Sequence, residues 1–201
     1  YESLLIWNCR GDLPLNEGEN VESAEHAPEG YTTLLPPAVE GPHAVITHNE
    51  DGPPKLYGHC RWLTVNHANG TLFSTFHYPR MLPRHTFSVN SDGLVQTINN
   101  IRVDDLQPGI PRHFICRVIL DFNTFEEALV HIQRRDRASG FHHSLGDNSG
   151  NNLLSVEAPS SACEVKRSVS PLHMPTICWT KKFLDCLKLK QIPQLFVKTC
   201  R

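Results

Sequence analysis

The residues best suited to chemistry stand in one short polar stretch, Thr47-His48-Asn49-Glu50-Asp51-Gly52. Asp51 would supply a carboxylate, and Asn49 an amide that orients a site. The stretch ends an apolar run at 44–47, and binding or catalytic residues often lie where a strand gives way to a loop. The same residues also suit a solvated turn, with Asp51 before Gly52 and Asn49 capping the strand. The residues alone leave both interpretations open.

A hairpin is predicted to position this stretch. The apolar runs at 32–35 and 44–47 are separated by Pro36, Pro37, Gly41 and Pro42, and each run ends in turn-forming residues. Two short apolar runs separated by Pro and Gly residues are typical of paired strands. The polar stretch then falls at the end of the second strand.

The remaining pattern predicts an α+β fold, with a helical pair between runs of strands. Asn69-Gly70 favours a type I′ turn. Pro111 can open a helix, and Thr124-Phe125-Glu126-Glu127 matches a capping box. Strands are expected at 3–9, 60–65, 71–76, 86–89, 94–98, 142–145, 153–156 and 163–169, and the segment after Pro171 is irregular.

Composition is that of an ordinary globular domain. The chain has 201 residues, 39% hydrophobic and 20% charged, with a net charge of −2. Lys and Arg do not form a basic block, which argues against a nucleic-acid partner. No apolar run approaches the roughly 20 residues of a membrane helix, and no basic leader is visible at the N-terminus. Neither nucleic acid nor membrane is therefore expected as a partner.

The seven cysteines are dispersed, odd in number and without a Cys-x-x-Cys pair. This spacing argues against a zinc site or a full disulfide framework. Scattered cysteines usually behave as small buried hydrophobes. We expect a reducing, cytoplasmic environment, no metal and no cofactor.

Several motifs in order give the chain a resemblance to a known family. Gly30-Tyr31-Thr32-Thr33 precedes the hairpin, and Asn49-Glu50-Asp51 follows it. Further motifs are Phe76-His77-Tyr78-Pro79, the stretch 87–100, Pro111-Arg112-His113-Phe114, the stretch 140–146 and Ser155-Val156-Glu157-Ala158-Pro159. Together they resemble the autoproteolytic penicillin acyltransferase family, which includes the carcinine and β-alanyl-dopamine hydrolases. The resemblance runs from about Leu4 to Thr176.

The resemblance implies that position 31 holds the nucleophile, which is Cys in active members and Tyr31 here. Such a residue attacks the preceding carbonyl, and the α-amine freed by cleavage then serves as its base. Cys, Ser and Thr can do this because their nucleophilic atom is bonded to Cβ. The Tyr31 hydroxyl stands at the far end of a rigid ring with a pKa of about 10. We expect the Gly30–Tyr31 bond to stay intact and the ring to pack into the emptied pocket.

Other site positions are also implied by the resemblance. Asp51 matches the carboxylate that supports the nucleophile, and Pro175 falls where the family has an oxyanion-binding Asn. Pro offers neither a side-chain amide nor a backbone N–H. Asn99 and Asn100 would line the pocket.

Four further residues have roles that the pattern alone leaves open or predicts. Arg112 and His113 would bind an anion at a helix N-terminus or form a solvated first turn. His142 and His143 alternate along a strand, so one is expected in the core and the other outside.

The fold that the resemblance implies is the αββα sandwich of N-terminal-nucleophile hydrolases, incomplete at both ends. We expect one domain over 1–201, with a strand and acidic linker at 1–30, a core at 31–176 and an irregular tail at 177–201.

Three functions follow from these observations. The first is a degenerate, inactive relative of enzymes acting on small acyl amines such as β-alanyl amides, with such an amine as ligand if the pocket survives. The second is an active amide hydrolase or acyltransferase that uses another nucleophile, for which Cys60 is the nearest candidate. The third is a structural or interaction domain. The oligomeric state is left open.

Overall fold

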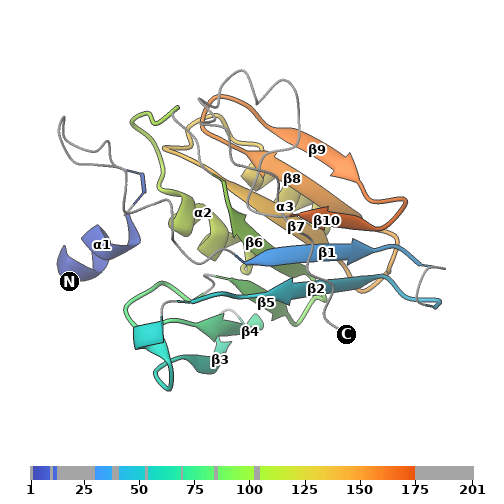
Figure 1. Cartoon of the computed structure of the whole chain (residues 1–201), viewed down its shortest axis with the longest axis horizontal. Helices are drawn as coiled ribbons and strands as arrows, with labels where there is room; N and C mark the ends of the chain where they lie inside the picture. The colour runs from blue at the N-terminus through green and yellow to red at the C-terminus, as the bar shows by residue number, and fades with distance from the viewer. Residues whose placement is uncertain are drawn as a thin grey trace.

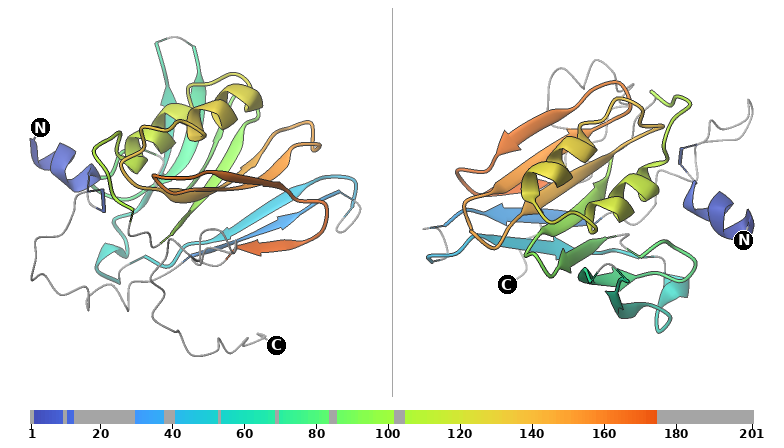
Figure 2. Two further views of the ribbon diagram at one scale, coloured as in Figure 1. Left: turned by 90° about the horizontal axis from the view of Figure 1, so that it is seen from above. Right: turned by 180° about the vertical axis from the view of Figure 1, so that it is seen from behind.

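The computed structural model describes residues 2–9, 11–12, 30–37, 41–52, 54–68, 70–83, 86–101 and 105–174. They form stacked layers, seen edge-on in Figure 2: two helices, a large sheet and a small sheet. The α+β prediction is therefore confirmed. Among the described residues, no helix covers the far side of the small sheet.

The small sheet contains the predicted hairpin. It is formed by β1 (Tyr31–Leu35), β2 (Val45–Asn49) and β10 (Leu172–Met174), in the order β10-β1-β2. Strands β1 and β2 pair in antiparallel register from Tyr31 opposite Asn49 to Leu35 opposite Val45. This register places Tyr31 opposite Asn49 of the polar stretch, and Figure 1 shows β1 and β2 side by side.

The large sheet is antiparallel throughout and follows chain order, β3-β4-β5-β6-β7-β8-β9. Its strands are β3 (Arg61–Asn66), β4 (Leu72–His77), β5 (Phe87–Asn90), β6 (Val95–Asn100), β7 (Phe141–Gly146), β8 (Leu153–Ala158) and β9 (Glu164–Arg167). Each lies within a few residues of its predicted range. Strands β3 and β4 pair across the Gly70 turn, whereas Asn69 lies outside the described residues.

Helices α2 (Arg112–Ile119) and α3 (Phe125–Ile132) cover the other face of the large sheet. Their apolar sides, with Ile119 and Ile132 fully buried, pack on Leu145 and Val156 of the sheet. The predicted N-cap at Thr124 is present, because the Glu127 N–H donates to Thr124 Oγ1, and the Glu127 carboxylate accepts from the Thr124 hydroxyl instead of from its backbone N–H as a full capping box requires. The large sheet is thus covered on both faces.

The first element differs from its prediction. Residues Glu2–Asn8 form helix α1 rather than a strand. A short apolar run does not separate helix from strand by periodicity. Asn8 decides the outcome, since its Nδ2 donates to the Leu4 carbonyl one turn back and to the Arg80 carbonyl, while its Oδ1 accepts from the Leu82 N–H.

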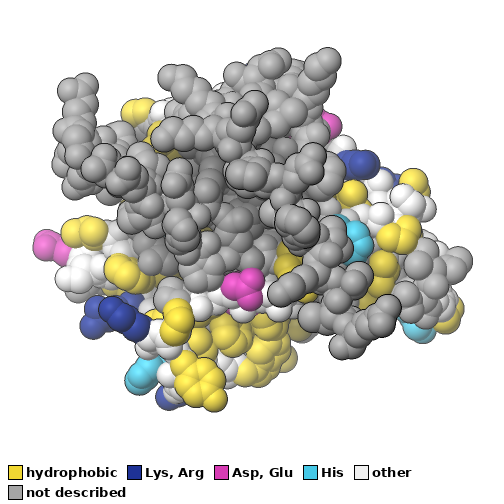
Figure 3. Space-filling model, viewed as in Figure 1, with side chains coloured by type: hydrophobic (Ala, Val, Ile, Leu, Met, Phe, Trp, Pro, Cys, Tyr) yellow, Lys and Arg dark blue, Asp and Glu magenta, His cyan; other side chains and the backbone are white. Residues whose placement is uncertain are grey.

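Strand β3 is the open edge of the large sheet, and apolar side chains gather near it. Hydrophobic side chains cluster at the lower part of the face in Figure 3, where Figure 1 places this edge. Trp62 of β3 and Tyr57 just before it are 58% and 92% exposed. No described helix is both long and apolar enough to cross a membrane.

Candidate functional site

The outer face of the small sheet carries the predicted nucleophile position. Tyr31 and Asn49 are cross-strand partners, so their side chains share a face, and Asp51 is two residues further along. Asn49 Nδ2 donates to Asp51 Oδ1 at 2.8 Å. The structure therefore places Tyr31, Asn49 and Asp51 together, as the sequence suggested.

The Tyr31 ring does not fill a pocket. It is 52% exposed, because no described element lies over this face of the sheet. The expectation that the ring packs into an emptied cavity is therefore wrong.

The same face continues onto β10. Thr33 Oγ1 hydrogen-bonds His173 Nδ1 at 2.7 Å, and these two residues are cross-strand partners. Strand β10 was not predicted, because three residues are too few to show alternation. Pro175 lies outside the described residues.

The opposite, inner face of the small sheet holds a continuous set of hydrogen-bonded side chains, which we call the inner polar chain. It consists of Asn99, Thr97, Thr32, His48, Glu50 and Tyr78. Thr32 Oγ1, fully buried, lies 2.7 Å from Asn99 Oδ1, 2.9 Å from Thr97 Oγ1 and 2.8 Å from His48 Nδ1. His48 Nε2 lies 3.2 Å from Glu50 Oε2.

The order hydroxyl, imidazole, carboxylate is that of a catalytic triad, but the proton positions differ from one. Asn99 Nδ2 donates to the Gly30 carbonyl, so Asn99 Oδ1 can only accept, and Thr32 must give its one proton to it. His48 Nδ1 then has to donate to Thr32 Oγ1, and Nε2 must also donate if Glu50 is ionised. In this arrangement His48 Nδ1 is a donor toward Thr32 Oγ1, so it offers no lone pair that could activate Thr32.

Tyr78 closes the far end of the chain. Its hydroxyl donates to Glu50 Oε1 at 2.7 Å, and burial together with this carboxylate raises the pKa of Tyr78 above its usual value. A Cβ at Gly52 would lie 2.3 Å from the Tyr78 oxygen, so only glycine fits there. Tyr78 is thus held as a neutral donor.

The inner and outer faces meet at Gly30. Its carbonyl oxygen accepts a hydrogen bond of 2.9 Å from Asn99 Nδ2, and a Cβ at Gly30 would lie 2.4 Å from the Asn49 carbonyl oxygen. Asn99 is 2% exposed, so it binds the backbone before Tyr31 rather than lining an open pocket.

Asn100 and Arg112 form a separate contact. Arg112 Nη1 donates to Asn100 Oδ1 at 2.8 Å, and the guanidinium lies 4.3 Å from the centre of the Phe141 ring. The N-terminus of α2 already has an anion, because the Arg112 N–H donates to Asp12 Oδ1 at 2.9 Å. His113 is buried against Phe141 rather than forming a solvated first turn.

Both histidines of β7 are buried, so the expectation of one outward histidine is wrong. His142 and His143 are 1% and 3% exposed. The reason is that β7 is an interior strand, between β6 and β8, of a sheet that is covered on both faces. His142 Nε2 hydrogen-bonds Ser155 Oγ at 2.8 Å, whereas Nδ1 is buried without a partner.

His142 predicts acid sensitivity. Burial lowers the pKa of His142 to about 3, while an unfolded chain would titrate near ~6.5. Below pH ~6.5 the unfolded state binds a proton at His142 that the folded state does not bind. The free energy of unfolding should therefore fall by roughly 1 kcal/mol for each pH unit below ~6.5. Urea unfolding at several pH values would measure this slope. His142→Gln should flatten it, and an unchanged slope in that variant would assign the effect elsewhere.

Cys60 lacks the surroundings of a nucleophile. Its Sγ contacts the Leu56 carbonyl at 3.5 Å, and no described histidine or carboxylate hydrogen-bonds it. Within the described ranges, no group of three metal-binding side chains is arranged to hold an ion.

The sequence did not identify five residues of the inner polar chain as site residues: Thr32, His48, Glu50, Thr97 and Tyr78. Part of the signal was present, because residues 48 and 50 follow the predicted strand at 44–47 and residues 97 and 99 span the end of the one at 94–98, and residues two apart in an extended chain share a face. What the sequence did not show is which face of the hairpin lies against β6.

Comparison with known families gives a clear match. The family model described as acyl-coenzyme A:6-aminopenicillanic acid acyl-transferase matches residues 39–176, more than half of the chain. The chain belongs to this family. It is a family of N-terminal-nucleophile acyltransferases and acylases, in agreement with the expected family and fold class, although Tyr31 lies upstream of the matched range.

Among solved structures, the chain is similar to penicillin V acylase from Agrobacterium tumefaciens, with a TM-score of 0.35 and 17% identity. The match covers 70% of this chain and 43% of that enzyme, so the chain spans less than half of its length. No match was found among curated proteins.

Proposed function

We propose that this family member is degenerate: it neither cleaves itself before residue 31 nor hydrolyses amides. The observation that carries the proposal is Tyr31 at the nucleophile position, 52% exposed at the start of β1. Its retained role is binding a small acyl amine, such as a β-alanyl amide, or pairing with an active relative.

The geometry of tyrosine supports this proposal. A nucleophile that attacks the preceding carbonyl must form a small ring, which requires the reactive atom on Cβ. The phenol oxygen is separated from Cβ by the whole ring and cannot return to Gly30. Without cleavage no α-amine is freed, so the usual base of such a site is never produced.

Three further features support inactivity. The thiol of Cys60 has no hydrogen-bonded base among the described residues, and Asp51 is engaged by Asn49. Pro175 stands where the resemblance places an oxyanion donor, and loss of one such donor costs about 10²–10³ in rate. These features lower the expected rate even if another nucleophile were available.

The test is turnover. Purified protein incubated with β-alanyl amines and acyl thioesters should release product at the uncatalysed rate. Asp51→Ala should behave identically, and Asp92→Asn, an exposed carboxylate elsewhere, serves as the matched control. Product formation that Asp51→Ala abolishes and Asp92→Asn retains would refute the proposal and favour an active hydrolase.

A further inference from the structure

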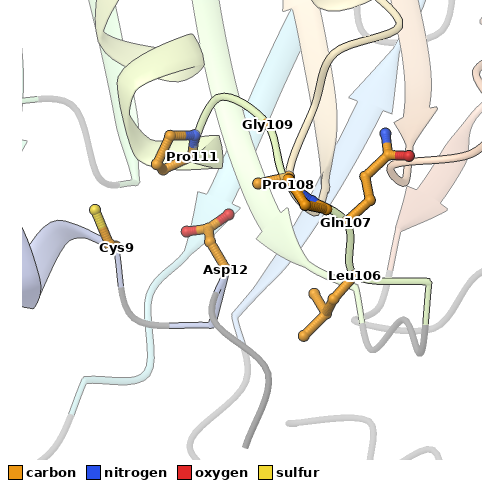
Figure 4. Close-up of a pocket in the computed structure, with 8 residues that line it drawn as sticks. Cys9, Asp12, Leu106, Gln107, Pro108, Gly109 and Pro111 are labelled. Atoms are coloured by element: carbon orange, nitrogen blue, oxygen red, sulfur yellow. The ribbon is translucent and has the colours of Figure 1, made fainter.

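A pocket between the end of α1 and the loop before α2 is separate from the strand ends described above. It has a volume of about 360 Å³ and is lined mainly by apolar groups. Its lining includes Leu106, Pro108, Pro111 and Ala138, with Cys9 and Asp12 at one side (Figure 4). This volume is within the range of small-molecule sites.

Asp12 is the charged group of this pocket, and half of its carboxylate is unsatisfied. The side chain is 5% exposed. Oδ1 accepts from the Arg112 N–H and from the Ser139 hydroxyl, whereas Oδ2 is buried with no hydrogen-bond partner. Figure 4 shows the carboxylate directed toward the space between Pro111 and Pro108. Burying a carboxylate oxygen without a hydrogen-bond donor costs folding free energy, so a ligand that donates to Oδ2 would be stabilised here.

Most of the described backbone of the wall does not supply that donor. Pro108 and Pro111 have no N–H. The backbone N–H of Gln107 donates to the Ala138 carbonyl at 3.0 Å, and that of Ala138 donates to the Ile110 carbonyl at 2.9 Å. The Asp12 N–H donates to the Cys9 carbonyl. These N–H groups are already engaged, so Asp12 Oδ2 is left to a donor carried by a ligand.

We propose that this pocket binds a small organic amine in its ammonium form, with the N–H directed at Asp12 Oδ2 and a compact apolar body against Leu106 and the two prolines. A charge-assisted hydrogen bond satisfies the orphan oxygen, and the apolar wall buries the hydrocarbon part. The pocket shares no residue with the inner polar chain or with Tyr31, so the site is independent of whether amide hydrolysis is retained.

The charged groups facing Asp12 set the pH dependence. Burial raises the pKa of Asp12, opposed by the hydrogen bonds from Arg112 and Ser139 and by the Arg112 charge. The neighbouring Cys9 thiol has its own pKa raised by burial and by Asp12. An ammonium ligand requires the ionised carboxylate. Its binding should therefore weaken as pH falls through the raised pKa of Asp12.

The experiment titrates the full chain with cyclohexylmethylamine, followed by NMR shifts or calorimetry, beside cyclohexylmethanol and cyclohexanecarboxylate. We expect saturable binding of the amine alone, which weakens as the pH is lowered stepwise from 8. Asp12→Asn should weaken it about tenfold or more, whereas Asp92→Asn should bind like the wild type. Leu106→Trp, which enlarges a lining side chain and keeps the carboxylate, should also abolish binding and gives the answer if Asp12→Asn does not fold.

Three results would overturn the proposal. These are equal binding of amine and alcohol, undiminished amine binding in Asp12→Asn or Leu106→Trp, and the absence of saturation by any amine concentration that leaves the protein folded.

Discussion

Tyr31→Cys should convert an intact chain into two fragments, divided between residues 30 and 31. The substitution moves the nucleophilic atom onto Cβ, from which a five-membered ring with the Gly30 carbonyl carbon can form. The carbonyl oxygen already accepts a hydrogen bond from Asn99 Nδ2, so the oxyanion that develops there has a donor in place. Asp51 and Asn49 lie on the same face of the sheet. Intact-mass spectrometry over time would follow the reaction.

Two controls accompany this variant. Tyr31→Ala removes the ring without adding a thiol and should stay uncut, which separates a nucleophilic effect from exposure to a contaminating protease. Tyr31→Cys combined with Asn99→Ala should be cut about 10²–10³ times more slowly, as for other lost oxyanion donors. A Tyr31→Cys protein that remains whole would show that position 31 is not the equivalent of the family nucleophile.

Replacing His48 by Ala should lower the free energy of unfolding by about 1–3 kcal/mol, the usual cost of leaving a buried polar group without its hydrogen-bond partner. The loss arises because His48, whose side chain is 4% exposed, is the link between Thr32 and Glu50. Its removal leaves the Glu50 carboxylate with Tyr78 as its remaining partner in the inner polar chain. Urea unfolding followed by circular dichroism would measure the change.

His43→Ala is the matched control, because His43 is an exposed histidine on the same hairpin. Its effect should stay within about 0.5 kcal/mol, as for most surface changes. If His48→Ala also cost less than about 1 kcal/mol, the inner polar chain would not hold the two sheets together, and the proton assignment given above would lose its support.

The sequence predicted the strands where alternation and turn residues agreed. The hairpins on either side of Gly70 and Gly93 appear close to their expected ranges, since both glycines adopt positive φ as such turns require. The N-cap at Thr124 was equally local. Residues 3–9 failed because a tertiary contact, made by Asn8 to the segment at 80–82, decided between helix and strand.

The site was only partly predictable for the same reason. Asn49 and Asp51 were found from their position at a strand end, and Gly30 and Tyr31 from the resemblance. The partners of Thr32 come from β2 and β6. Strand β6 is distant in sequence, and nothing local shows that the β1–β2 hairpin faces it. The burial of His143 likewise depends on β7 being an interior strand. The position of β7 in the sheet is a property of the whole topology.

The proposed inactivity depends on the inability of Tyr31 to attack the peptide bond before it. The most direct measurement is the intact mass of the wild-type chain, purified under denaturing conditions with protease inhibitors. We predict one species with an unbroken link between Gly30 and Tyr31, unchanged after prolonged incubation at neutral pH. A pair of fragments whose masses place the break at that bond would contradict the claim. It would show that the chain cleaves itself there although the Tyr31 hydroxyl cannot reach the Gly30 carbonyl.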